Sequence, residues 1–376
     1  MRIGLNLLFL EPGRTGGMET YARELVPLLP EAMPEASFTV LAGRELAWEW
    51  LATPWHEGVE LSSLSVSSGT RIRRTAAEQL LVARAARRLK LDLLHSLSAS
   101  APVAPGCRSV ITIHDLMFLT YPEAQTRAMA LGLRLVVPPA ARRASRLIAP
   151  SRSTADDITR CLGVEAARID VIPEGPGRPP VALGMSDEEV RARFGLGEAP
   201  VVLSVSARRP HKNLRRLIEA MALVPGAVLV LPGYETVFDE ELRGVARAAG
   251  VEERVRLVGW VTDEELEGLY RSAGCMVFPS LSEGFGLPVL EAMGRGVPVA
   301  VSGETALAEV AGNAGLRLDP MSIGSIADAI QALLTDPELR DSLVRQGLVR
   351  AADFDWPRAA AATAESYRRA LGQGRM

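Results

Sequence analysis

The chain has 376 residues, a length that suits about two domains of ordinary size. Its apolar fraction of 48% and net charge of -3 exclude a disordered chain and give no broad footprint for a nucleic acid. No run approaches the roughly 20 apolar residues that span a bilayer, and no cleavage site follows Met1, so we expect a cytoplasmic protein. The three cysteines are scattered, without the spacing of a metal or disulfide framework.

Short apolar runs alternate with longer helical patterns along the whole chain, which is typical of βαβ units. In the first part the helical patterns cover residues 18–29 and 75–89. The apolar runs there predict strands at 3–7, 38–41, 91–95, 110–114 and 146–150, with a weaker strand at 169–172.

The densest cluster of proline and glycine, residues 173–180, is interpreted as a domain linker. Beyond it, helices are expected to start at Lys212, Asp239, Thr262 and Pro288, and a last helix covers 356–371. Strands are expected at 201–206, 227–232, 255–258, 275–279, 297–300 and near 316.

These series predict an α/β chain with two Rossmann-like, doubly wound parallel-sheet domains that face an interdomain cleft. The predicted domains are residues 1–172 and 173–355. Ligands of open α/β sheets bind beyond the carboxyl ends of the strands. The loops that follow strands are therefore the candidate sites.

Two loops of the first domain are candidates. Gly16 and Gly17 follow the first strand and precede a helix, where backbone amides can face a phosphate, although an ordinary βα loop has the same glycines. The G-x-G-x-x-G spacing of a dinucleotide site is missing. His114, with Asp115 beside it, closes the strand 110–114 and is expected to face the cleft, whereas His95 is interpreted as a structural residue.

In the second domain, a basic loop follows the strand at 201–206. It holds Arg208, Arg209 and Lys212 just before a helix. An arginine fork, a lysine point charge and a helix N-terminus together can clamp a diphosphate. A solvated cationic loop is the alternative.

The most informative segment is residues 278–293, a buried strand that ends in a Gly-rich loop and opens a helix. Pro288 fits the first helical turn, where its missing amide costs nothing. Carboxylates accept hydrogen bonds from vicinal hydroxyls, so Glu283 can hold a hexose and Glu291 a ribose. Glu291 can instead simply complement the helix dipole. The intervening loop, whose amides are expected to face the cleft, is Gly284, Phe285, Gly286 and Leu287.

Two other patterns allow a second interpretation. Asp353 and Asp355 resemble an acidic pair that holds a metal, but they precede a helix, and we interpret Asp355 as its cap. Residues 71–90 are basic and amphipathic, which fits either peripheral contact with an anionic membrane surface or acceptor, or a solvated helix face.

Taken together, these positions resemble the family 4 glycosyltransferases of GT-B architecture over nearly the whole chain. The Glu-x7-Glu motif from Glu283 to Glu291 is the most specific landmark. The others, in order, are Gly16-Gly17, His114-Asp115, residues 150–154, Arg208 with Lys212-Asn213, and residues 259–263.

The resemblance implies a set of donor contacts. Arg208 and Lys212 would hold the donor diphosphate, and Glu291 would bind the nucleotide ribose. Glu283, with the backbone of residues 284–287, would position the transferred sugar, and His114 would contact the sugar or phosphate near the reacting carbon. The loop with Trp260 and Val261 would lie against the base.

The resemblance also implies transfer with retention of anomeric configuration, no metal, and no cofactor apart from the nucleotide-diphosphate sugar donor. The acceptor would be a glycan, a lipid-linked molecule or a small molecule, and helix 356–376 would cross back to the first domain. Similarity around residues 114–122 suggests a mannosyl-type donor. A nucleotide-sugar epimerase and a catalytically silent binding partner stay open as alternatives.

Overall fold

The computed structural model describes residues 1–376 except 53–54, 56, 68–70, 122–126, 183 and 373–376. The chain forms two compact units. Unit 1 holds Met1–Gly175 with Phe354–Met376, and unit 2 holds Pro176–Asp353. The chain therefore passes between the units after Gly175 and Asp353, where the sequence predicted boundaries at 172 and 355.

The described part of unit 1 is built on a seven-stranded parallel sheet in the order β3-β2-β1-β4-β5-β6-β7. Its strands are β1 (Arg2–Asn6), β2 (Ser37–Ala42), β3 (Val59–Ser63), β4 (Leu93–Ser96), β5 (Arg108–Thr112), β6 (Arg146–Ala149) and β7 (Ile169–Val171). Its helices are α1 (Gly17–Leu25), α2 (Leu29–Ala32), α3 (Arg44–Ala52), α4 (Arg71–Ala77), α5 (Ala83–Arg88), α6 (Met117–Thr120), α7 (Arg127–Arg143), α8 (Arg152–Leu162) and α17 (Trp356–Ala370).

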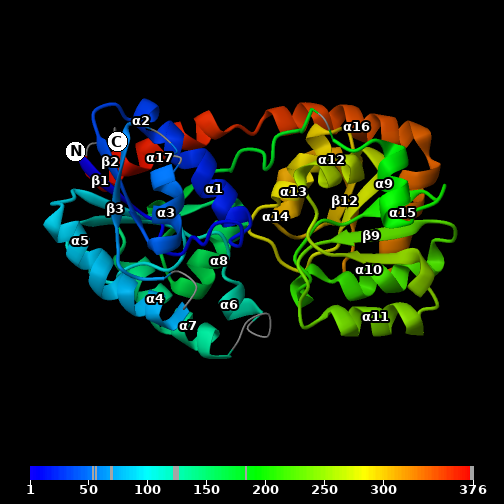
Figure 1. Cartoon of the computed structure of the whole chain (residues 1–376), viewed down its shortest axis with the longest axis horizontal. Helices are drawn as coiled ribbons and strands as arrows, with labels where there is room; N and C mark the ends of the chain where they lie inside the picture. Colours follow the sequence, from blue (N-terminus) through cyan, green and yellow to red (C-terminus); the bar gives the residue numbers. More distant parts are fainter. Residues whose placement is uncertain (53–54, 56, 68–70, 122–126, 183, 373–376) are drawn as a thin grey trace. The chain divides into compact units, whose positions relative to one another are not determined.

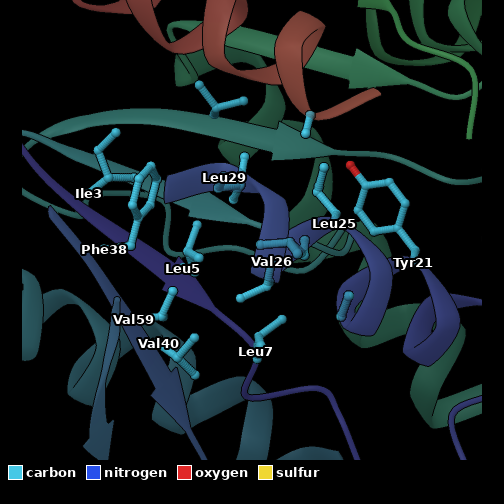
Figure 2. Close-up of a cluster of buried hydrophobic side chains, with 14 of the residues drawn as sticks. Ile3, Leu5, Leu7, Tyr21, Leu25, Val26, Leu29, Phe38, Val40 and Val59 are labelled. Atoms are coloured by element: carbon cyan, nitrogen blue, oxygen red, sulfur yellow. The ribbon is translucent and has the colours of Figure 1, made fainter. Parts of the chain in front are cut away.

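The core of unit 1 forms where α1 and α2 pack on the first strands. Figure 2 shows Leu25 and Leu29 in one cluster with Ile3, Leu5 and Phe38 of the sheet, all of them buried. Burial of such aliphatic side chains contributes roughly 1.5 to 3 kcal/mol each. The alternation of apolar residues along β1 and α1 is therefore what fixes the first βα unit.

Two local details differ from the predicted elements. The single helix expected at 18–29 is divided by a 3-10 turn at Val26–Leu28, because Pro27 and Pro30 cannot donate helical hydrogen bonds. The sequence also missed strand β3, whose residues Val59–Ser63 are mostly polar and incompletely buried at the sheet edge. An edge strand of this kind carries no continuous apolar run.

Helix α17 belongs to unit 1 by contact. It packs against α1, α2, β5 and β6, and in Figure 1 it is the red helix beside α2. Its Tyr367 hydroxyl lies 2.6 Å from His95 Nδ1, and its Arg369 donates to Asp170 at 2.8 Å. Asp355 caps the first turn by accepting from the amide of Arg358, as the sequence predicted.

The described part of unit 2 has a six-stranded parallel sheet in the order β10-β9-β8-β11-β12-β13. Its strands are β8 (Val201–Leu203), β9 (Val228–Pro232), β10 (Val255–Val258), β11 (Ala273–Phe278), β12 (Val299–Ser302) and β13 (Gly315–Leu318). Its helices are α9 (Asp187–Phe194), α10 (Leu214–Ala220), α11 (Asp239–Ala248), α12 (Asp263–Ser272), α13 (Leu287–Gly294), α14 (Ala306–Ala311), α15 (Ile323–Thr335) and α16 (Pro337–Ala352). The predicted α/β class with two doubly wound parallel sheets is confirmed.

Capping residues explain where the helices near the strand ends of unit 2 begin. Thr262 and Glu265 form a reciprocal capping box at the start of α12, which fixes the loop between β10 and that helix.

In the described part of the chain, no helix combines the length and the apolar character needed to cross a bilayer.

Candidate functional site

The candidate site is centred where two loops contact each other. These loops follow the adjacent strands β8 and β11. The Leu281 amide donates to the His211 carbonyl at 2.7 Å, which ties the loops together. Asn213 adopts a left-handed backbone with φ 56°, a conformation that asparagine tolerates, and its side chain donates to the Pro279 and Pro320 carbonyls. These bonds hold Lys212 at the carboxyl end of the sheet.

Lys212 and Glu283 form an ion pair between these loops. Lys212 Nζ lies 2.6 Å from Glu283 Oε1, and the two side chains are 17% and 8% exposed. The sequence predicted both residues separately, and the structure brings them into contact. An anion that enters this position competes with Glu283 for the ammonium group, and the released carboxylate is then able to accept hydrogen bonds from hydroxyls.

In the structure, Arg208 is buried and its partners lie within unit 2. This residue is only 1% exposed, and its guanidinium pairs with Asp239 and donates to the carbonyls of Leu231 and Val258. A guanidinium committed to a buried carboxylate and two carbonyls braces the ends of β9 and β10. Lys212 is the more accessible of the two cations, and the diphosphate contact expected of Arg208 stays a prediction.

The Gly-rich turn between Glu283 and α13 depends on the absence of a side chain. Gly286 has φ 127°, and a Cβ there would lie 2.6 Å from Leu307 Cδ2. The helix then begins at Leu287, with Pro288 in its first turn as predicted. Phe285 is buried, which anchors the loop beside Glu283.

Glu291 lies on α13 and is bound through both carboxylate oxygens. Its Oε1 accepts from the Arg178 amide at 2.9 Å, and its Oε2 accepts from the Tyr270 hydroxyl at 2.8 Å. Burial and the Glu291 charge raise the pKa of Tyr270 well above its usual value, so the hydroxyl stays a donor. A Cβ at Gly177 would lie 1.9 Å from Oε1, so a larger residue there would displace this carboxylate.

Trp260 and Val261 follow β10. Val261 is buried, whereas Trp260 is 56% exposed and stacks on Tyr234, with ring centroids 4.5 Å apart. The Arg178 guanidinium lies 5.1 Å from the Trp260 ring centroid and pairs with Asp263 at 2.7 Å. Arg178 thus connects two predicted positions, since its amide binds Glu291 and its side chain covers Trp260.

In unit 1, the loop with Gly16 and Gly17 is shaped by an acid on α1. Gly16 has φ 67° and caps the helix. Both carboxylate oxygens of Glu19 accept from the Gly13 amide, and Arg23 donates to the same carboxylate. The loop therefore has a defined conformation at the carboxyl end of β1.

His114 follows β5 and both of its ring nitrogens have partners. Nδ1 lies 3.0 Å from Glu174 Oε1, and Nε2 lies 3.0 Å from the Leu97 carbonyl. Burial lowers the pKa of His114, but the hydrogen bond and charge of Glu174 outweigh it and hold that pKa above its usual value. His95 is different, because burial lowers its pKa to about 3.

Sequence reasoning missed four residues of these clusters. Glu174 and Arg178 lie in the segment that was interpreted only as a linker, and a Pro/Gly cluster does not show which of its polar residues fold back onto a sheet. Tyr270 lies within a predicted helix. Tyr234 lies in the loop after β9, at the carboxyl end of a strand, where ligands of open α/β sheets bind, so its position could have been noticed from the sequence. Among the described residues, no group of three or more His, Cys, Asp and Glu is arranged to hold a metal ion.

Two family models match the chain. Residues 15–175 match the model described as Glycosyltransferase Family 4, and residues 186–349 match the model described as Glycosyl transferases group 1. The first match covers the described strands of unit 1 except β1, and the second covers the described strands of unit 2.

Several similar proteins are named as glycosyltransferases. The O-antigen chain mannosyltransferase B of Escherichia coli is 31% identical over 275 residues, which cover 69% of this chain and 70% of that protein. The D-inositol 3-phosphate glycosyltransferase of Pseudarthrobacter chlorophenolicus is 27% identical over 401 residues, covering 96% and 91%. The serotype-specific mannosyltransferase WbdA of E. coli is 30% identical, and the match spans only 29% of its length.

Solved structures share the fold across the chain. Sucrose-phosphate synthase from Thermosynechococcus elongatus superposes with a TM-score of 0.76 at 22% identity and 98% coverage of both chains. HepE from Anabaena, solved in complex with UDP and glucose, superposes with a TM-score of 0.75 at 22% identity, covering 98% of this chain and 99% of that one. At this identity the likeness concerns the fold.

Proposed function

The chain belongs to the group 1, family 4 glycosyltransferases with the GT-B fold, and from this premise we propose that it transfers a hexosyl group from a nucleotide-diphosphate sugar to an acceptor hydroxyl. The observation that carries the proposal is the Lys212–Glu283 pair at the carboxyl ends of β8 and β11. A cation and a carboxylate at 2.6 Å provide one group for a phosphate and one for sugar hydroxyls.

The donor would lie along the loops of unit 2. Lys212 binds the diphosphate, and Glu283 with the backbone of residues 284–287 positions the sugar. Glu291 accepts hydrogen bonds from the ribose hydroxyls. Each of its two oxygens already accepts one bond, from Arg178 or from Tyr270, and can accept a second because each oxygen has two acceptor sites. The base lies against the exposed Trp260, with Val261 and Tyr234 beside it.

The chemistry follows from where charge develops. Cleavage of the glycosyl phosphate bond leaves negative charge on the departing diphosphate and positive charge on the sugar. Fixed donors that face the developing negative charge stabilise the transition state, and Lys212 is placed to do so. Glu283, once released from Lys212, faces the sugar with a negative charge. We propose retention of configuration and no metal, in keeping with the family resemblance.

The transferred sugar is proposed to be of the mannosyl type. Support comes from two of the relatives, which are named as mannosyltransferases. The acceptor is proposed to be a glycan, a lipid-linked molecule or a small molecule with a free hydroxyl. Proton NMR of the product would show whether the anomeric configuration is retained, and an assay in excess chelator would show whether a metal is needed.

A peripheral membrane contact is proposed for unit 1. On the outer side of the segment from α4 to α5, Leu80 is exposed beside the cations Arg84, Arg87 and Arg88. Apolar and cationic side chains on one helical surface suit an anionic lipid layer. Sedimentation with vesicles of phosphatidylcholine, with and without phosphatidylglycerol, tests this. Binding only to the anionic vesicles supports the contact, and equal or absent binding contradicts it.

Two other functions make different predictions in one assay. The purified protein is incubated with nucleotide sugars, with and without an acceptor, and the products are separated. A transferase gives a glycosylated acceptor, an epimerase gives an isomerised donor without acceptor, and a silent binding partner gives neither. Isomerised donor or an unchanged mixture across a full panel of donors and acceptors would overturn the proposal.

A further inference from the structure

Lys212 and Glu283, both in unit 2, occupy each other's charge in the empty site. Lys212 ends the 3-10 turn Pro210–Lys212 after β8, and Glu283 lies between β11 and α13. Lys212 Nζ lies 2.6 Å from Glu283 Oε1, and little of either side chain is exposed. A diphosphate that approaches this ammonium group must therefore displace Glu283 or lie against its negative charge.

The backbones that carry the two residues are bonded to each other. The Leu281 amide, two residues before Glu283, donates to the His211 carbonyl at 2.7 Å. The Asn213 side chain, next to Lys212, donates to the Pro279 carbonyl at 3.0 Å. Because these bonds join the two loops on both sides of the pair, the pair opens by rotation of its side chains rather than by separation of the loops.

Two other basic residues of the loop are not available to replace Lys212 as the partner of Glu283. The Arg208 guanidinium is buried and committed to Asp239. His211 is neutral, because burial and the neighbouring charges of Lys212 and Arg209 lower its pKa to about 3. When Lys212 turns to an incoming diphosphate, neither residue neutralises the carboxylate that it leaves.

The two ligands of the proposed reaction differ in what they return to Glu283. A free nucleoside diphosphate ends in an ionised phosphate, which offers negative charge and no hydroxyl donor at that end. It leaves Glu283 as a buried carboxylate without its cation, which is costly. A nucleotide sugar carries hydroxyl groups beyond the diphosphate, and a carboxylate accepts hydrogen bonds from them. The intact donor therefore replaces the lost bond, and the free diphosphate does not.

We propose that Glu283 is a specificity-determining residue that selects the intact nucleotide sugar against the free nucleoside diphosphate by this exchange of partners. The inference rests on the proposed function, in which Lys212 binds the diphosphate and Glu283 faces the sugar. It adds that the Lys212–Glu283 pair of the empty site is a competitor that only a ligand with both a diphosphate and a hydroxyl-bearing sugar displaces without loss.

The exchange couples the two halves of the donor. A diphosphate on Lys212 releases Glu283 for hydroxyl groups, and hydroxyl groups on Glu283 release Lys212 for a diphosphate. Such coupling is reciprocal, so each half raises the affinity for the other by the same factor. The same exchange lowers inhibition by the nucleoside diphosphate that the reaction produces, because Glu283 returns to Lys212 once the sugar is absent.

The test compares nucleoside diphosphates with their own sugars. The full-length protein is titrated in a calorimeter, without acceptor, with GDP and GDP-mannose, UDP and UDP-glucose, and ADP and ADP-glucose. The quantity measured is the Kd of each nucleoside diphosphate divided by the Kd of its sugar. Glu283→Gln removes the charge at nearly constant shape. Glu253→Gln is the matched control, at an exposed acid in the turn that precedes β10, at the amino end of that strand.

We expect Glu283→Gln to lower this ratio of Kd values at least about tenfold. The nucleoside diphosphate should bind more tightly because Lys212 has lost its competitor, and the nucleotide sugar should bind less tightly. Glu253→Gln should keep the wild-type ratio. A pair with a merely structural role would affect both ligands alike. An unchanged ratio in Glu283→Gln, or weaker binding of the nucleoside diphosphate by that variant, would overturn the proposal.

A second measurement uses only the wild-type protein. Saturation-transfer NMR with free mannose and free glucose reports contact of the sugars with the protein. Addition of the nucleoside diphosphate that binds should strengthen the sugar signal, because the diphosphate releases Glu283. Equal sugar signals with and without the nucleoside diphosphate would contradict the exchange.

Failure of this inference is distinguishable from failure of the proposed function. If neither the nucleoside diphosphates nor their sugars bind the wild-type protein, the proposed function is wrong and the inference falls with it. If they bind and a sugar is transferred to an acceptor, but the ratio of Kd values is the same in Glu283→Gln, only the selection by Glu283 is wrong.

Discussion

At the residue scale, Arg208 and Lys212 show what can and what cannot be predicted from the sequence. Arg208 and Lys212 occupy one loop and looked equivalent, but Arg208 is buried against Asp239 whereas Lys212 reaches Glu283. The distinction depends on which way each side chain points after a strand, and on a partner 31 residues away. Neither is encoded in the local pattern, although the strand end itself was predicted.

Arg208 should therefore matter for stability. Arg208→Ala leaves Asp239 buried without its cation, which should lower the free energy of unfolding of unit 2 by about 3 to 5 kcal/mol. The exposed neighbour Arg209 provides the control, since the free energy of unfolding of Arg209→Ala should stay within about 0.5 kcal/mol of the wild-type value. Urea unfolding of the three proteins measures this. Similar stability of Arg208→Ala and wild type would show that the buried pair is dispensable.

Glu283 should matter for turnover rather than for nucleotide binding. Glu283→Gln removes the charge that neutralises Lys212, so a nucleoside diphosphate should bind at least as tightly as to wild type, while transfer falls by about 100-fold or more because the sugar loses its carboxylate. Calorimetry and a transfer assay measure the two effects separately. Weaker nucleotide binding together with normal transfer is the opposite pattern and would reverse the assignment.

The His114–Glu174 pair also predicts a pH dependence of stability. The pKa of His114 is raised in the folded protein, so its contribution is fully present below the unfolded pKa of about 6.5 and is lost as pH rises through the folded pKa. The excess Tm of wild type over Glu174→Gln should therefore be largest below about pH 6.5 and shrink as pH rises through the folded pKa of His114. A difference that stays constant as pH rises would argue against the pair.

At the scale of elements, apolar periodicity located the strands well, whereas several helices, among them α7 and α16, were not predicted. The described strands of both sheets were predicted except β3, which is polar and lies at an edge. The segment 173–180 shows the complementary limit. It was interpreted as a linker, yet the Arg178 amide bonds Glu291, and Arg295 donates to the Arg178 carbonyl. The amide of Val181, just beyond the segment, bonds Glu267. Turn-forming composition does not reveal such contacts.

At this scale we predict that a hydrogen bond from helix α17 contributes to stability. Its Tyr367 hydroxyl bonds His95, which in turn bonds Thr112 on β5. Tyr367→Phe should leave His95 Nδ1 buried without a partner and lower stability by about 1 to 3 kcal/mol. Tyr234→Phe, at a partly exposed ring, is the matched control for stability. Equal melting of Tyr367→Phe and the control would show that the bond from Tyr367 to His95 does not stabilise the protein.

At the scale of the whole molecule, each unit has its own sheet and its own apolar core, which is why the alternating pattern predicted the fold class from sequence. Family membership came from motif order, and the matched family models cover most of both units. The identity of the donor and acceptor did not follow. Under the proposed function the base of the donor lies against Trp260, and the contacts of Trp260 with Tyr234 and Arg178 are not contained in the linear sequence.

The central claim is that the strand-end loops of unit 2 bind a nucleotide-diphosphate sugar through Lys212. Calorimetric titration of full-length protein with GDP, UDP and ADP tests it directly. We predict saturable binding of at least one of them, weakened at least about tenfold, or about 1.4 kcal/mol, by Lys212→Ala and unaffected by Arg215→Ala at the nearby exposed position. Absence of binding by all three, or equal binding by Lys212→Ala and wild type, would contradict the claim.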